Sequence, residues 1–92
     1  MALLDTDQLA DLSARRPGWE VDDGAMRRTF EFDDFVGSVG FVIRVALLAE
    51  KANHHPDIDI RWNEVTLTLS THSEGGLTEK DSDLSELIDR LV

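Results

Sequence analysis

The 92-residue sequence predicts an α+β fold. The expected order is αββαββα, with a four-stranded antiparallel sheet and three helices packed on one face. Four segments alternate apolar and polar residues, as half-buried strands do, and three others repeat apolar residues at helical spacing. Strands with one wet face are typical of antiparallel sheets that helices cover on one side. The length suits a single domain over residues 1–92.

The first predicted helix begins near Thr6, whose hydroxyl is expected to cap it. Leu9 and Leu12 share one face of this helix. Arginines in its last turn suit the negative end of the helix dipole. Pro17-Gly18 then ends it, because proline cannot continue the backbone hydrogen-bond pattern.

Residues 19–32 predict a hairpin. Trp19 and Val21 alternate with acidic residues on the first strand. On the second strand, Met26 and Phe30 lie an even number of residues apart, so they point to the same face. Asp23-Gly24 between them is a strong signal for a two-residue turn.

The second predicted helix is capped by Asp33 or Asp34 and runs to about Lys51. Two apolar stripes run along it, the first Phe35, Val39, Val42, Ala46 and Ala49, the second Val36, Ile43 and Leu47. A helix this apolar is buried on more than one side. The sheet covers one side, and a partner subunit is expected to cover another, so a homodimer or homotetramer is predicted.

Pro56 favours extended backbone at the preceding residue, so this helix must end by about His54. Residues 57–62 and 64–71 then alternate as a second hairpin around Asn63. The phase of this alternation places Trp62, like Trp19, in the core, although an aromatic ring near the histidines could also stack on a flat ligand. A last helix is capped by Thr78, and its apolar face is Leu84, Leu87, Ile88 and Leu91.

Composition excludes several functions. There are no cysteines, which removes disulfides and thiolate metal sites and makes a reducing cytoplasm the simplest location. The net charge of −10 opposes direct binding to nucleic acid or an anionic membrane. Aspartates outnumber glutamates by 12 to 7. A high-salt environment and genomic base composition both account for that bias.

The three histidines are expected to gather at one corner of the molecule. His54 and His55 lie where the second helix meets the third strand, and antiparallel pairing of the second hairpin returns His72 beside them. Imidazoles exchange protons near neutral pH, so this cluster predicts acid/base chemistry.

Two other interpretations of the histidines are open. Single loop histidines are more often structural or solvated. Three histidines can also hold catalytic zinc, although adjacent histidines chelate poorly because their rings diverge. Asp81, three residues after Thr78, is most simply part of a capping box.

Residues 49–84, AEKANHHPDIDIRWNEVTLTLSTHSEGGLTEKDSDL, closely resemble the pterin-4a-carbinolamine dehydratase family. The resemblance is carried by the E-K-x-x-H-H-P run, an aromatic at Trp62, the strand that ends in Thr71-His72, and G-L-T-x-x-D over 76–81. Upstream, residues 18–42 have that family's W…R-x-F-x-F-x-x-F pattern. The match covers nearly the whole chain, although Trp62 stands where tyrosine is expected.

The resemblance implies the same αββαββα fold and dimers or tetramers. It implies dehydration of 4a-hydroxytetrahydropterin to quinonoid dihydropterin, which recycles the cofactor of aromatic amino acid hydroxylases, with no metal or organic cofactor. A non-catalytic pterin-binding or protein-assembly module on the same fold is the alternative. The implied catalytic residues are His54, His55 and His72, and the implied pterin-binding residues add Pro56, Thr71, Ser73 and Glu74.

Overall fold

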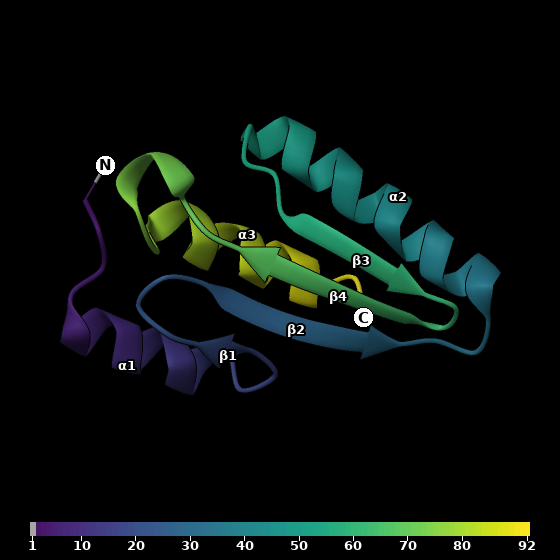
Figure 1. The fold of residues 1–92 in the computed structure, drawn as a ribbon, viewed down its shortest axis with the longest axis horizontal. Helices are drawn as coiled ribbons and strands as arrows, with labels where there is room; N and C mark the ends of the chain where they lie inside the picture. The colour runs from purple at the N-terminus through teal and green to yellow at the C-terminus, as the bar shows by residue number, and fades with distance from the viewer. Residues whose placement is uncertain (1) are drawn as a thin grey trace.

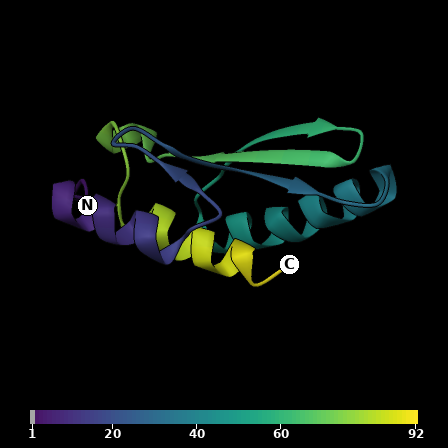
Figure 2. The same cartoon turned by 90° about the horizontal axis from the view of Figure 1, so that it is seen from below.

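A computed structural model, which describes residues 2–92, places one antiparallel sheet against a layer of three helices (Figure 1). The strands are β1 (Glu20–Val21), β2 (Met26–Glu31), β3 (Asp57–Arg61) and β4 (Glu64–Leu69). They lie in the order β1-β2-β4-β3, and all neighbours are antiparallel. Seen from the side, all three helices cover the same face of the sheet (Figure 2). The predicted fold class is confirmed. The helices are α1 (Thr6–Arg15), α2 (Phe35–Ala52) and α3 (Glu79–Asp89), with a 3₁₀ turn, η1, at His72–Glu74.

Strand register separates the two faces of the sheet. On the central strand β4, Val65, Leu67 and Leu69 are fully buried against the helices. The intervening Thr66 and Thr68 lie on the opposite face. There Thr66 shares a hydrogen bond of 2.8 Å with Thr29. The alternation along the sequence therefore corresponds to one apolar face and one polar face.

The cap of α1 is Asp5 rather than the predicted Thr6. The Asp5 carboxylate accepts the N–H of Gln8, and the Gln8 side chain accepts the N–H of Asp5, both at 2.8 Å. This reciprocal capping box satisfies two free N–H groups at once, which is why the helix begins one residue earlier than a Thr6 cap predicts.

The buried row of α2 follows neither predicted stripe, although it shares Ala49 with the first. The sheet and α3 bury Ser38, Phe41, Val45 and Ala49, whereas Phe35 is 53% exposed. A polar residue can lie in this row because the Ser38 hydroxyl donates to the carbonyl of Asp34, the observed cap, at 3.2 Å. Since apolar residues occur all around α2, periodicity alone did not fix its rotation.

The second apolar stripe of α2 stays uncovered in the single chain. Val36, Ile43 and Leu47 are 79%, 58% and 67% exposed. Gly40 lies between them at the same helical spacing, and a Cβ added there would meet nothing within 4 Å. We call the row formed by Val36, Gly40, Ile43 and Leu47 the α2 seam.

Of the two tryptophans predicted to be in the core, only Trp19 is buried. It stacks edge-to-face on Phe30, and its indole Nε1 donates to Asp89 at 2.8 Å. Trp62 is 70% exposed, because β3 ends at Arg61 and Trp62 begins the turn to β4. It has a φ of 51°, so it leaves the strand geometry on which the prediction depended.

The remaining helix, α3, buries Leu84 and Ile88, while Leu87 is exposed. Arg16, just after α1, is buried and donates to Ser85 Oγ at 3.1 Å, which ties α1 to α3. None of the helices in residues 2–92 has the length and apolar content needed to cross a membrane.

Candidate active site

Figure 1 shows the end of the sheet where β3 begins and β4 ends. Residues at this end line a cavity of about 290 Å³. Three separate segments form it: the α2–β3 connection, the β4–η1 connection and the first turn of α3. All three histidines line it, and the full lining is Asn53, His54, His55, Ser70, Thr71, His72, Ser73 and Lys80. The predicted clustering of the histidines is therefore present.

The backbone at the end of α2 positions the first two histidines. Asn53 adopts the left-handed conformation, with φ 50° and ψ 44°, and its N–H bonds to the carbonyl of Glu50 at 3.2 Å. The N–H of His54 bonds back to the carbonyl of Ala49 at 3.1 Å. These two bonds make a Schellman motif, which ends the helix and fixes where His54 leaves it.

His54 is held by the buried carboxyl group of Asp81. The distance from His54 Nε2 to Asp81 Oδ1 is 2.6 Å. The second oxygen, Oδ2, accepts the Thr71 hydroxyl at 2.7 Å and the Thr78 N–H at 3.0 Å. The Asp81 side chain is fully buried, and the His54 side chain is 10% exposed. One carboxyl group therefore joins the end of α2, the end of β4 and the start of α3.

This network assigns the hydrogen on His54. A carboxylate that already accepts two bonds on Oδ2 acts as an acceptor at Oδ1 as well, so His54 Nε2 donates to it. The other ring nitrogen, Nδ1, is then the one left to exchange a proton with a ligand. Asp–His pairs set the tautomer and orientation of the imidazole in this way.

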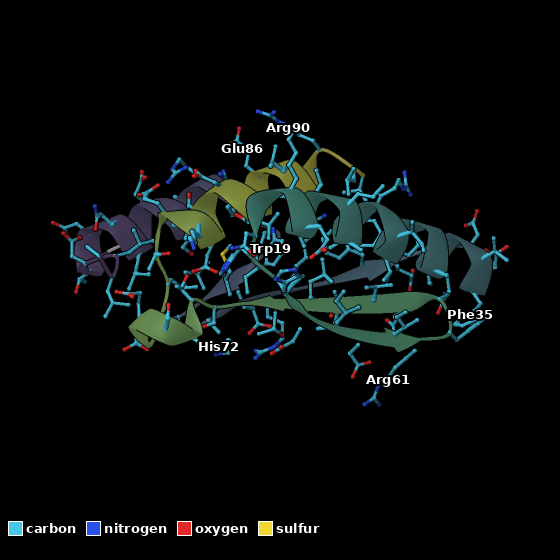
Figure 3. The ribbon with its side chains drawn as sticks, turned by 90° about the horizontal axis from the view of Figure 1, so that it is seen from above. Trp19, Phe35, Arg61, His72, Glu86 and Arg90 are labelled. Atoms are coloured by element: carbon cyan, nitrogen blue, oxygen red, sulfur yellow. The ribbon has the colours of Figure 1, made fainter. Side chains whose placement is uncertain are left out.

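The other two histidines are more accessible. The His55 side chain is 56% exposed, and its Nε2 pairs with the carboxylate of Glu50 on the last turns of α2. His72 is exposed and begins η1, beside the sheet rather than within the helical layer (Figure 3). The turn that carries His72 is closed by a bridge between Thr71 and Gly76.

Close packing explains the glycine at position 76. A Cβ there would approach the carbonyl oxygen of Asp23 to 2.7 Å. The carboxylate of the neighbouring Asp22 accepts the N–H groups of Ala25 and Gly24, and these bonds lower the pKa of Asp22. Both contacts help to fix the β1–β2 turn beside the segment that carries His72.

Most of the predicted site residues are brought together, and some are not. His54, His55, Thr71, His72 and Ser73 line the cavity. Pro56 follows His55 in the sequence and Glu74 follows Ser73, but neither Pro56 nor Glu74 lines the cavity.

Sequence reasoning missed other members of the site. The lining residues Asn53, Ser70 and Lys80 were not predicted. Glu50 and Asp81 were not identified as partners of His55 and His54. The spacing of Asp81 from Thr78 predicted a capping box. That box uses only Oδ2 of Asp81, so it gave no indication that Oδ1 binds His54. No group of three or more potential ligands in residues 2–92 is arranged to hold a metal ion.

A family model described as pterin 4 alpha carbinolamine dehydratase matches residues 2–91. The chain belongs to the pterin-4a-carbinolamine dehydratase family. A protein of Mycobacteroides abscessus, provisionally named pterin-4-alpha-carbinolamine dehydratase, is 52% identical over 92 residues, which cover 100% of this chain and 98% of that protein. A relative with the same provisional name from Roseiflexus castenholzii is 47% identical over 91 residues, which cover 99% of this chain and 98% of that one.

Two solved structures resemble this chain, and the first agrees with its membership in the dehydratase family. The crystal structure of a transcriptional coactivator/pterin dehydratase from Brucella melitensis superposes with a TM-score of 0.92 at 36% identity and covers 98% of each chain. A pterin dehydratase-like protein described as a RuBisCO assembly factor in the alpha-carboxysome has a TM-score of 0.66 at 22% identity, and covers 79% of this chain and 84% of that one. The second likeness concerns the fold alone. Family membership supports the general activity of a pterin-carbinolamine dehydratase.

Proposed function

We propose that this chain dehydrates 4a-hydroxytetrahydropterin to quinonoid dihydropterin by histidine acid/base catalysis, and so recycles the cofactor of aromatic amino acid hydroxylases. The observation that carries the proposal is the convergence of every histidine of the chain on one cavity, with His54 oriented by Asp81. Membership in the dehydratase family supplies the substrate class.

The reaction needs two proton transfers and no change of oxidation state. An acid donates a proton to the hydroxyl on C4a, the C–O bond breaks and water leaves. The neighbouring ring nitrogen supplies the electron pair that forms the new C=N bond, and it gives up its proton to a base. We assign the acid and base roles to His54 and His72, which reach the cavity from different segments, and pterin holding to His55 with Pro56, Thr71, Ser73 and Glu74.

The test is a dehydratase assay with enzymatically generated carbinolamine. His54→Ala and His72→Ala are each expected to lower kcat by roughly 10- to 10⁴-fold, the usual range for a lost proton-transfer group. His55→Ala is expected to raise KM more than it lowers kcat. Arg61→Ala is the control, because Arg61 is exposed and lies at the far end of β3 (Figure 3). Rates equal to wild type in both His54→Ala and His72→Ala would remove the assignment.

A non-catalytic assembly module is the second candidate. The uncovered α2 seam favours protein association, and one protein of similar fold is described as an assembly factor. Assembly alone gives no reason for a buried carboxyl group to orient a cavity histidine. An inactive wild-type protein that still associates would favour this second candidate.

A further inference from the structure

Lys80 gives the histidine cavity a local positive charge. It is the one lysine or arginine among the eight lining residues, and none of the eight is acidic, although the chain has 19 acidic and 9 basic side chains. The carboxyl groups of Asp81 and Glu50 are already bonded to cavity histidines. Within residues 2–92, Lys80 forms no ion pair with any carboxylate.

The position of Lys80 on its helix has no local explanation. It lies in the first turn of α3, near the positive end of the helix dipole, where a cation is disfavoured. The other lysine, Lys51, lies in the last turn of α2, where the dipole favours it. Departures from local rules concentrate at functional sites. Lys80 is such a departure, and Lys51 is not.

At the start of α3, the backbone N–H groups of Thr78 and Lys80 are not free to bind an anion. The N–H of Thr78 donates to Asp81, and the N–H of Lys80 donates to the Thr78 hydroxyl at 3.3 Å. The positive charge that would attract an anion here is the ammonium group of Lys80. Its long flexible stem places the ammonium group as a mobile point charge at the edge of the cavity.

We propose that Lys80 forms a subsite for an anionic group, a phosphate or a carboxylate, on the side chain of the pterin. This inference rests on the proposed function, since it assumes a pterin in the histidine cavity. The cavity of about 290 Å³ is small for a ligand pocket, for which roughly 300–1,000 Å³ is usual. In the proposed arrangement, a bicyclic ring fills the interior against the buried His54 and Thr71, and its side chain extends to the exposed Lys80.

The experiment measures Kd by fluorescence for three 7,8-dihydropterins. One has a neutral dihydroxypropyl side chain, one has the same side chain ending in phosphate, and one has a side chain ending in carboxylate. Wild type is expected to bind at least one anionic ligand about fivefold more tightly than the neutral one, the fold-change of a partly exposed ion pair. The stronger of the two anionic ligands identifies the group. Raising KCl should reduce the preference, because salt screens exposed charges.

Three variants make the test specific. Lys80→Met should abolish the preference, measured as the ratio of the Kd for the neutral ligand to the Kd for the anionic one, and Lys80→Arg should retain it. Lys51→Met removes the same charge outside the cavity and should behave as wild type. Equal wild-type affinity for all three ligands, or a preference that persists in Lys80→Met, would overturn the subsite. A parallel dehydratase assay with the neutral carbinolamine separates the two ideas: activity without an anionic preference removes only the subsite, and absence of activity removes the proposed function.

Discussion

At the scale of single residues, Asp81 and His54 show how one side chain can serve the fold and the site together. Asp81 Oδ2 completes the cap of α3 through the N–H of Thr78, and Asp81 Oδ1 holds the ring of His54. The sequence allowed the first role to be predicted, because the capping box depends on local spacing. The second role joins residues 27 positions apart, and local spacing carries no information about it.

Asp81→Asn tests the positioning role. The amide oxygen would stay on the side of the Thr78 N–H and the Thr71 hydroxyl, which both donate to it, so the NH₂ would face His54 Nε2 and the protein would lose the acceptor that fixes the imidazole tautomer. We expect kcat to fall by roughly 10- to 10³-fold with a smaller change in KM. The ¹⁵N chemical shifts of His54 should report a changed tautomer. Thr78→Ser, which keeps a capping hydroxyl, is the control. An unchanged kcat together with an unchanged imidazole signal would contradict the role.

At the scale of elements, the hairpins were more predictable than the helix rotations. Asp23-Gly24 marks a turn by its backbone preferences, and strand alternation fixes which residues face the helices. The face of α2 was not predictable, because the helix is apolar nearly all round and a buried Ser38 is accommodated by a backbone bond. Trp62 was misplaced because a hairpin turn begins one residue earlier than the alternation suggests.

Trp62→Gly tests the cost of that turn. Trp62 begins a two-residue turn with a φ of 51°, a position that glycine occupies without steric strain. We expect the free energy of unfolding to rise by roughly 0.5–1 kcal/mol, since relief of left-handed strain outweighs the extra freedom of glycine in the unfolded chain. Denaturant unfolding at fixed protein concentration measures the change. Trp62→Phe keeps the strain and should not stabilise, so equal effects of the two variants would refute the explanation.

At the scale of the whole molecule, the α2 seam and the net charge act against each other. The seam leaves three large apolar side chains exposed, and we propose that a second copy of the chain covers it in a homodimer or homotetramer. Each copy brings a formal charge of −10, so association concentrates like charges. Salt shortens the Debye length from about 30 Å at 0.01 M to about 3 Å at 1 M, which reduces the repulsion without weakening apolar burial to the same degree.

Added KCl is therefore expected to raise both the oligomer fraction and the Tm. Sedimentation and thermal melts across that salt range measure the two quantities. Ile43→Glu should leave a monomer at every salt concentration, because it places a charge in the middle of the seam. Val92→Glu adds the same charge at an exposed position that is not part of the seam and should associate as wild type does. A wild-type monomer in 1 M KCl would refute the interface, and a Tm that falls with KCl would refute the repulsion.

The three-segment origin of the cavity has a consequence for splitting the chain. A break between Trp62 and Asn63 would fall in an exposed turn at the opposite end of the hairpin from the histidines. The first fragment would keep His54 and His55, and the second would keep His72 and Asp81. Neither fragment holds a complete set of proton-transfer groups. The two fragments could therefore serve as a split reporter, in which dehydratase turnover shows that they have associated.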